Sequence, residues 1–361
     1  MKILITYATA GAGHKKAAEA IYHQLSRDSR HQVVFQDVLE YTNRFYKSSY
    51  SKGYTFLITR LPWLWGIFFG LLDQPWLFPV MTLARRINNT LNAGAFHQYL
   101  IEQQFDYIIS THFLPNEVAG YLKRSGKICS KILSVVTDYD VHRIWLSKGI
   151  DDYAVASGWT REKMRILGFE EKVVHVTGIP TDEKFAEHRD IQALKEKLGI
   201  RDGVFTVLIA TGSFGIGPIE KIVRHLEGIQ VLVVCGHNQG LHNRLARKQN
   251  PLVKAFGFVN NMDELMAVSD AMITKPGGLS ISEALVTGLP LIFFNAIPGQ
   301  EENNVKVLAA HGVGVSHCPV EQMAAVLKHF QDAPEEYREA RLKSQRLGRP
   351  NAVKDILALI Q

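Results

Sequence analysis

The chain has 361 residues, of which 46% are hydrophobic and 21% are charged, and its formal net charge is +6. This length allows about two domains, and the balance of residue types is that of a folded globular protein. The three cysteines, Cys129, Cys235 and Cys318, show no CxxC or Cys/His spacing. The sequence therefore suggests neither a disulfide framework nor a zinc site, and it fits a reducing compartment. The opening residues, MKILITYATAGAGH, lack the pattern of a signal peptide.

The first predicted strand, KILITYA, leads into Gly11, Gly13 and His14 at the start of a predicted helix. Glycines at such a turn bring backbone amides close to a ligand. Lys16 replaces the third glycine of a dinucleotide fingerprint, and no Gly-Lys-Ser/Thr follows, which excludes a P-loop. An imidazole at the end of a strand can accept a proton near neutral pH, so His14 is a candidate general base. The alternative is a histidine that only hydrogen-bonds locally.

Residues 41–100 concentrate both positive charge and aromatic side chains. They hold six of the 41 Lys and Arg residues, a single acid (Asp73) and 14 of the 35 aromatics. The aromatics alternate with Leu, Ile and Val rather than with Gly and polar residues, which favours an anionic lipid surface over nucleic acid.

The stretch from 60 to 86, RLPWLWGIFFGLLDQPWLFPVMTLARR, contains three of the five tryptophans. Its uncharged run from Leu61 ends at Leu72, whereas a membrane-spanning helix needs about 20 apolar residues. Pro62, Pro75 and Pro79 break the helix further. We expect a face that lies in the plane of a membrane surface, with a buried core and an oligomer interface as alternatives. The candidate lipid contacts are Arg60, Trp63, Trp65, Phe68, Phe69, Trp76, Arg85 and Arg86.

Further strands follow as FDYIIST, ICSKILSVVTD, DYAVAS and KVVHVTG, spaced by helical segments. The segment VVTDYDVHRIW holds Asp138, Asp140 and His142, and a D-x-D pair is one way to hold a divalent ion on a diphosphate. That role is typical of single-domain nucleotide-sugar enzymes, so we expect no metal here.

A break rich in Gly, Pro and charge at 178–190 precedes a second set of strands: FTVLIAT, QVLVVCG, VKAFGFV, AMITK, LPLIFF and GVGVS. Strands that alternate with helices indicate parallel sheets covered on both faces. We therefore predict an α/β protein with two doubly wound, Rossmann-like domains, at 1–178 and 179–335, and a helical segment at 336–361. Such sheets bind ligands at the carboxyl ends of their strands.

The second half repeats the strand, glycine loop and helix arrangement at Gly212, Gly215 and Gly217, which suits a diphosphate but is a weak signal alone. A stronger one is ITKPGGLSISEAL, where Lys275 and two glycines end a strand before Ser280 and Glu283. Glu283, placed in the first turn of the next helix, has two interpretations: a capping-box partner of Ser280, or an acceptor for ribose hydroxyls. The polar run Gln300–Asn304 suits sugar hydroxyls, or a solvated loop.

Together these segments resemble the monogalactosyl- and monoglucosyl-diacylglycerol synthases and, more distantly, the N-acetylglucosaminyltransferase that completes the lipid-linked peptidoglycan precursor. The most specific segments are GAGHKKAAEAI, VVTDYDVHRIW, GFVNNMDELMAVSDAMITKPGG, SEALVTGLP and PGQEENN. The resemblance implies the GT-B glycosyltransferase architecture, with an acceptor domain first, a UDP-sugar domain second, and a last helix that returns to the first domain. The first loop lacks the triple glycine common in plant enzymes, and Glu302 and Asn303 replace small residues of many relatives, which leaves the hexose open.

By the same resemblance, His14 is the general base, and Asp138 orients it or replaces it. Glu283 holds the ribose, GFV lies near the uracil, PGQE reaches the hexose, and the glycine loop and the TKPGG turn contact the diphosphate. The predicted donor contacts are Gly13, Gly212, Ser213, Phe214, Gly215, Gly217, Phe258, Val259, Lys275, Gly277, Gly278, Ser280, Glu283, Gln300, Glu301 and Asn304.

The implied activity is an inverting transfer of glucose or galactose from a UDP-sugar to diacylglycerol, without cofactor or metal. The implied location is the cytoplasmic face of the membrane, as a peripheral protein with an anionic lipid surface as partner and no nucleic acid. The alternatives are a transferase for a polyprenyl-linked acceptor, a UDP-sugar epimerase of the same fold, and a non-catalytic UDP-sugar sensor.

Overall fold

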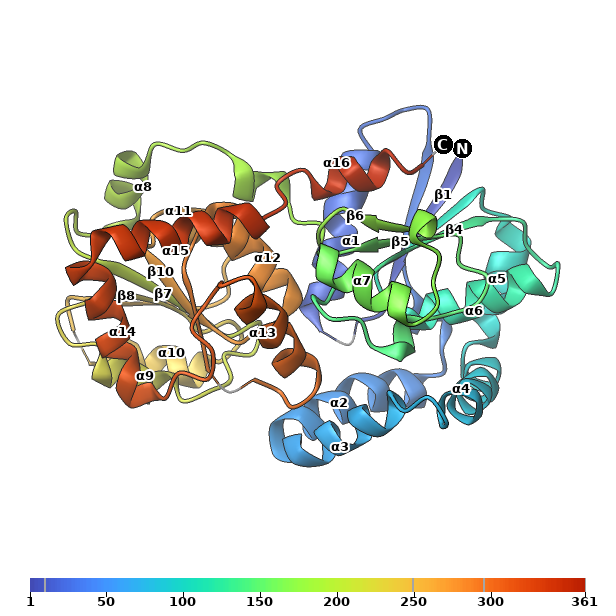
Figure 1. Cartoon of the computed structure of the whole chain (residues 1–361), viewed down its shortest axis with the longest axis horizontal. Helices are drawn as coiled ribbons and strands as arrows, with labels where there is room; N and C mark the ends of the chain where they lie inside the picture. The colour runs from blue at the N-terminus through green and yellow to red at the C-terminus, as the bar shows by residue number, and fades with distance from the viewer. Residues whose placement is uncertain (10, 249, 295, 361) are drawn as a thin grey trace. The chain divides into compact units, whose positions relative to one another are not determined.

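The computed structural model describes residues 1–9, 11–248, 250–294 and 296–360. Within two of its helices, the side chains of Ser51, Lys52, Tyr54, Thr55, Ile58, Thr59, Phe78, Arg86 and Thr90 lie outside the description. The chain divides into two compact units (Figure 1). Unit 1 comprises residues 1–182, 297–303 and 351–361, and unit 2 comprises residues 183–296 and 304–350.

Unit 1 is built on a six-stranded parallel sheet with the order β2-β1-β3-β4-β5-β6. Its strands are β1 (Lys2–Tyr7), β2 (Gln32–Asp37), β3 (Tyr107–Ser110), β4 (Lys131–Val135), β5 (Asp152–Val155) and β6 (Val174–Val176). Its α-helices are α1 (Ala12–Leu25), α2 (Arg44–Arg60), α3 (Pro62–Leu72), α4 (Phe78–Asn92), α5 (Gly94–Gln103), α6 (Phe113–Arg124), α7 (Gly158–Ile166) and α16 (Ala352–Leu357). Short 3₁₀ helices lie at η1 (Val38–Tyr41), η2 (Arg143–Trp145) and η3 (Glu171–Val173).

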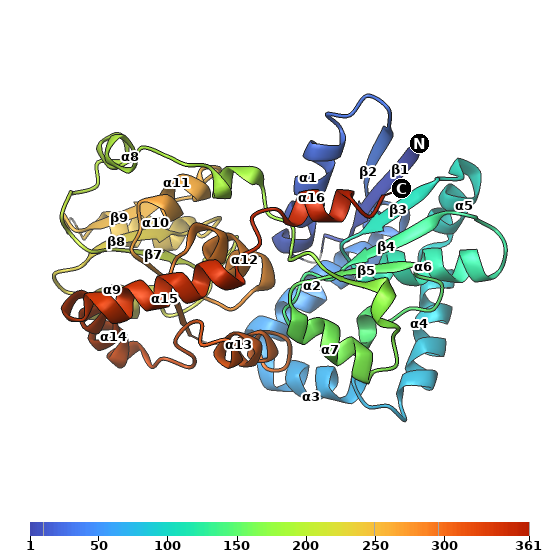
Figure 2. The same cartoon turned by 45° about the horizontal axis from the view of Figure 1, so that its top comes forward.

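The core of unit 1 has two layers because successive strand residues point to opposite faces of the sheet. Ile3 and Ile5 of β1 pack with Ile21 of α1, and Leu4 packs on the other face with Phe96 of α5. Ile356 of α16 is fully buried in the first of these layers, and α16 lies beside α1 (Figure 2). A segment from the far end of the sequence thus completes the core of unit 1.

Unit 2 has a five-stranded parallel sheet with the order β11-β10-β7-β8-β9. Its strands are β7 (Thr206–Ala210), β8 (Gln230–Val234), β9 (Val253–Phe256), β10 (Ala271–Thr274) and β11 (Leu291–Phe293). Its helices are η4 (Glu183–Ala186), α8 (Ile191–Leu198), α9 (Ile219–His225), α10 (Gln239–Ala246), α11 (Met262–Ala267), α12 (Gly278–Thr287), α14 (Val320–Asp332) and α15 (Pro334–Leu347). Helix α13 (Gln300–Ala310) begins in unit 1 and continues in unit 2.

The predicted fold class, two parallel doubly wound α/β domains, is confirmed. One predicted strand, GVGVS, is wrong, because only Val315 in it makes a bridge, to Ile292. Gly312 and Gly314 in that segment have positive φ, at 66° and 78°, which takes the backbone out of the extended conformation.

Helices α2 to α5 lie between β2 and β3 in the sequence and contain the aromatic segment. Pro62 and Pro79 stand at the beginnings of α3 and α4, where a missing N–H costs no helical hydrogen bond. Among the described residues, no helix is long and apolar enough to span a bilayer.

Candidate active site

The candidate base His14 lies in the first turn of α1, just after β1. Its Nδ1 is 2.8 Å from the carbonyl oxygen of Thr111 and 2.9 Å from Oγ1 of Thr137. In return, the hydroxyl of Thr111 donates to the backbone carbonyl of His14 at 2.8 Å. Because a carbonyl can only accept, Nδ1 carries the proton and Nε2 is the acceptor nitrogen.

His14 stands among other buried rings. The ring of His112 meets it edge to face at 4.7 Å, and Trp145 lies 6.1 Å away. Burial lowers the pKa of His14 to about 4, although the Thr111 carbonyl acts in the opposite direction. Burial, followed by the proximity of His14, holds the pKa of His112 well below its usual value. Both imidazoles are therefore neutral at neutral pH, which is the form that a general base needs.

Asp138 follows Thr137 at the end of β4 and is largely buried. Its carboxylate accepts from the amide of Gln300, with distances of 3.2 and 3.0 Å to its two oxygens. The groups seen to orient the His14 ring are thus Thr111 and Thr137. The role of Asp138 stays a prediction.

The remaining residues of the D-x-D segment have other partners. Asp140 pairs with Lys163 at 2.7 Å. His142 accepts from the Ile144 amide through Nδ1 and donates from Nε2 to the Phe69 carbonyl at 2.9 Å, so both of its nitrogens are in use. Within the described residues, no group of three His, Cys, Asp or Glu side chains is arranged to hold a metal.

His142 and its neighbour Arg143 instead fasten helix α3. The backbone amide of Arg143 donates to Oδ1 of Asp73 at 3.0 Å, and its Nε donates to the Asp73 carbonyl at 2.9 Å. The rings of His142 and Phe69 are 4.0 Å apart. The segment around the D-x-D pair, which suggested a metal site, therefore holds the end of helix α3 in place.

The predicted lipid contacts differ in how far they are exposed to solvent. Arg60, Trp63, Phe68 and Trp76 are exposed. Phe69 is buried against His142, so the expectation that it reaches lipid is wrong. Arg85 is partly buried beside Glu117 at 3.5 Å, and its contact with lipid stays a prediction. Trp65 is half-buried against Phe69. The side chain of Arg86 lies outside the described residues.

In unit 2, the predicted donor contacts follow β7, β9 and β10. The strands are parallel, so these loops share one edge of the sheet. Gly215 has φ +54°, and a Cβ there would clash with the carbonyl oxygen of Cys235. A Cβ on Gly217 would lie 2.7 Å from Phe294. These glycines are thus required by the packing of the loop itself.

Three rings gather at this edge. Phe258 stacks on His237 with centroids 4.8 Å apart and planes 17° apart, and Phe214 lies 6.4 Å from His237. Phe214 and Phe258 are more than half exposed. His237, in the loop after β8, was missed by sequence reasoning, although a Gly-His pair directly after a strand is the signal that marks it.

The position at which helix α12 begins excludes one of the two interpretations of Glu283, the capping box with Ser280. The helix begins at Gly278 with Gly277 as its N-cap, and no side chain caps it. Ser280 is therefore inside the helix, and Glu283 is in its second turn, so they form no capping box. Glu283 is only 7% exposed.

The other predicted donor contacts have these positions. Gly13 lies inside α1, and Ser213 accepts from the His237 amide through its carbonyl at 2.8 Å. Val259 follows β9, and Lys275 precedes α12. Glu301 accepts from the Ile297 amide at 2.8 Å. Asn304 is fully buried and donates to the Pro276 carbonyl at 3.0 Å, so it supports the turn before α12.

Two sequence families match the chain. The monogalactosyldiacylglycerol (MGDG) synthase family matches residues 14–181, and the glycosyltransferase family 28 C-terminal domain matches residues 206–356. A processive diacylglycerol β-glucosyltransferase of Bacillus licheniformis is 31% identical over 331 residues, which are 87% of this chain and 82% of that protein. The chain belongs to the diacylglycerol glycosyltransferase family. The predicted resemblance is confirmed, and the protein is a glycosyltransferase of glycolipid synthesis.

Further relatives of this glycosyltransferase agree. Monogalactosyldiacylglycerol synthase 3 of Arabidopsis thaliana is 27% identical over 98% of the chain and 80% of its own length. Among solved structures, MurG of Acinetobacter baumannii has a TM-score of 0.62 at 17% identity, covering 100% of this chain and 99% of that one. A UDP-GlcNAc 2-epimerase of Neisseria meningitidis, bound to UDP-GlcNAc, has a TM-score of 0.61 at 13% identity, with the same coverage. These structural likenesses show the GT-B fold, which transferases and epimerases share.

Proposed function

We propose that this protein is an inverting hexosyltransferase that moves glucose or galactose from a UDP-sugar to diacylglycerol and forms a β-glycoside. The observation that carries the proposal is His14, whose Nδ1 is fixed on Thr111 in a chain 31% identical to a diacylglycerol β-glucosyltransferase. In a single displacement, the acceptor hydroxyl attacks the anomeric carbon while Nε2 takes its proton. The bond to UDP breaks on the opposite face, which inverts the configuration.

The donor is proposed to bind in unit 2. The exposed faces of Phe214 and Phe258 suit a planar base, and base–aromatic stacking is worth about 1–3 kcal/mol. Glu283 is proposed to accept from the ribose hydroxyls, now that its capping interpretation is excluded. Backbone amides of the glycine loop and the charge of Lys275 are proposed to stabilise the leaving diphosphate without a metal.

The acceptor is proposed to reach unit 1 from a membrane surface at the cytoplasmic face. Large exposed apolar side chains gather on α2, α3 and α4 and between them, at Phe45, Phe56, Trp63, Leu64, Ile67, Phe68, Leu71, Trp76, Val80, Leu83, Ile87 and Leu91. Arg44 and Arg60, at the two ends of α2, are exposed cations in the same region, and Lys47 is a partly exposed cation there that pairs with Glu40. Aromatic rings with nearby cations are suited to the boundary of an anionic bilayer. The occupant of this surface is therefore proposed to be lipid.

The test is product analysis by mass spectrometry, with diacylglycerol vesicles and UDP-glucose or UDP-galactose supplied in turn. We expect a β-linked hexosyl-diacylglycerol with one of the two donors, its configuration read by NMR. Transfer only to a polyprenyl-linked acceptor would replace the proposed substrate. Binding of the UDP-sugar without any product would favour a sensor, and a changed sugar without transfer would favour an epimerase.

A further inference from the structure

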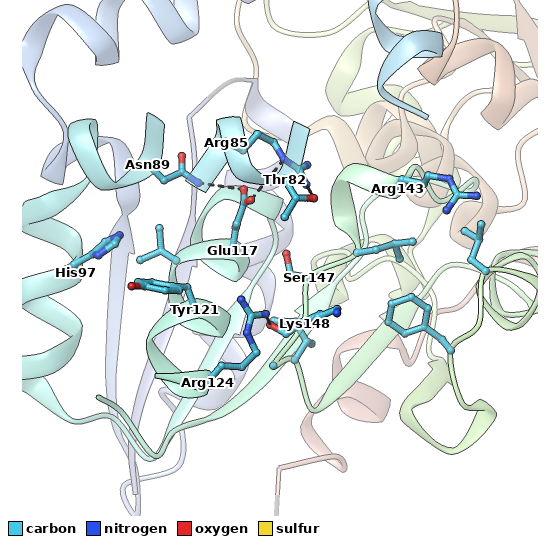
Figure 3. A pocket seen from close by; sticks show the side chains of 16 residues that line it. Thr82, Arg85, Asn89, His97, Glu117, Tyr121, Arg124, Arg143, Ser147 and Lys148 are labelled. Carbon is cyan, nitrogen blue, oxygen red and sulfur yellow. Dashed lines mark hydrogen bonds and ion pairs between the residues drawn. The ribbon is translucent and has the colours of Figure 1, made fainter. Parts of the chain in front are cut away.

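A cavity of about 460 Å³ lies within unit 1. Its walls come from α4, α5 and α6, from the segment 143–150 after β4, and from the end of α7 (Figure 3). Neither His14 nor Asp138 is part of its lining. We call this cavity the basic pocket.

Positive charge dominates the basic pocket. Four cations line it, Arg85, Arg124, Arg143 and Lys148, against one acid, Glu117. Arg85 is paired with that acid at 3.5 Å. Among the described residues no other acid lines the pocket, so the charges of the other three cations are not balanced within it. An anion is the ligand that this lining recognises.

One hydrogen-bonding group of the same pocket makes no hydrogen bond within the described part of the chain, the buried Nε2 of His97. Nε of Arg85 and Oε1 of Glu117 are the two atoms of the 3.5 Å ion pair, and Asn89 donates to the other Glu117 oxygen at 3.1 Å. A buried polar atom that makes no hydrogen bond is costly, and a polar group in the cavity would satisfy His97.

Helix α4 connects the basic pocket with the apolar surface. Its residues Thr82, Arg85 and Asn89 face the pocket (Figure 3), while Val80, Leu83, Ile87 and Leu91 are more than half exposed. One helix thus has a polar side toward the pocket and an apolar side toward solvent. Val118, Leu146 and Phe169 add apolar walls to the pocket itself. A molecule with an anionic head and an apolar tail matches both features.

We propose that the basic pocket binds the phosphate headgroup of an anionic membrane lipid and so holds unit 1 on anionic bilayers. Arg124 and Lys148, which are exposed, contact the phosphate, and Arg143, whose Nε already donates to the Asp73 carbonyl, adds its positive charge to the lining. This lipid is bound and is not consumed. The proposal does not rest on the transfer reaction, because binding is measured without any UDP-sugar.

The test is co-sedimentation of the full chain with phosphatidylcholine vesicles, with and without phosphatidylglycerol. The pocket variant is Arg124→Gln with Lys148→Gln, and its matched control is Lys131→Gln with Lys172→Gln, two exposed cations of unit 1 outside the pocket lining. We expect the pocket variant to lose roughly 30-fold in affinity for the anionic vesicles, as for two cations at a charged surface. The control should lose clearly less. Neither pair should change binding to phosphatidylcholine alone.

Two further measurements identify the ligand. Ser147→Trp fills the basic pocket without changing charge, and we expect it to abolish the gain in binding that phosphatidylglycerol produces; a thermal melt checks that it folds. Calorimetry with inorganic phosphate alone should show much weaker binding than the lipid. Tight binding of free phosphate that vesicles do not displace would overturn the lipid assignment. Equal losses of affinity in the two charge variants would show that any surface cation attracts the vesicles, and would overturn the proposal. Binding like the wild type by a folded Ser147→Trp protein would show that the cavity holds no lipid headgroup.

Discussion

Replacing Trp63 and Phe68 with Ser tests whether the apolar surface of α3 enters a membrane. Trp63 is 62% exposed and Phe68 is 48% exposed, so docking would remove roughly 150 and 100 Å² of their area from water. At about 25 cal/mol per Å² the full burial of both is worth ~6 kcal/mol. Insertion to half that extent leaves about 3 kcal/mol, or roughly a 100-fold loss of vesicle affinity.

The assay is co-sedimentation with vesicles at low and high salt, together with a thermal melt. Salt screens charges but leaves apolar burial intact, so the loss should persist at high salt. The matched control is Phe69→Ser, since Phe69 is in the same helix but buried against His142. That change should lower the melting temperature sharply. A folded Trp63→Ser/Phe68→Ser protein that binds vesicles like the wild type would refute lipid docking by α3.

Five other experiments test the active site and its supports. His14→Ala should lower turnover by roughly 10² to 10⁴ in single-turnover kinetics while UDP affinity stays constant, and retention of a tenth of the wild-type rate would exclude the base. Because the pKa of His14 is about 4, wild-type turnover should show no acid limb near 6.5 and should fall only as the pH approaches 4. Glu283→Gln should weaken UDP binding by about 1.5–3 kcal/mol in calorimetry, and unchanged affinity would return Glu283 to a structural role. EDTA should leave the rate intact; a strict requirement for added divalent ions would contradict the metal-free proposal. Asp73→Ala should speed amide exchange at the end of α3, because Arg143 loses a carboxylate partner, and exchange as slow as in the wild type would show that the helix is held otherwise.

The same histidine affects stability. The pKa of His14 in the folded protein is about 4, below the ordinary value of 6.5, so the unfolded chain binds the proton more readily. Between these two values the unfolded state therefore carries more protons, and the free energy of unfolding falls as the pH is lowered through that window. Above pH 6.5 this contribution is constant.

The fold could be predicted from the sequence because the buried parallel strands are short runs of Val and Ile separated by helical segments. Which side of α3 is exposed to solvent and which side is buried could not be predicted. Its sequence, PWLWGIFFGLL, has no polar side chain that marks a solvent side, so Trp63 and Trp65 look alike until their neighbours are known. Only the structure shows that His142 and Arg143, some 70 positions further along the chain, decide which rings are covered.

The candidate site was predictable where motif and strand end coincide, as at His14 and the loops of unit 2. The helix start at Gly278 was misjudged because Ser280 is a good capping residue by type, yet Gly277 takes the cap position. His237 was missed because its ring joins the candidate site by stacking on Phe258, which lies on a different loop.

The assignment of residues 351–360 to unit 1 determines the order in which the two units can mature during synthesis. A ribosome produces residues 183–350 before it produces α16, so unit 2 can form in full while unit 1 still lacks Ile356 and the rest of that helix. Until then, the apolar side of α1 is left without this cover. Newly made unit 1 therefore has a period in which a chaperone, or the membrane itself, can meet a surface that the finished protein hides.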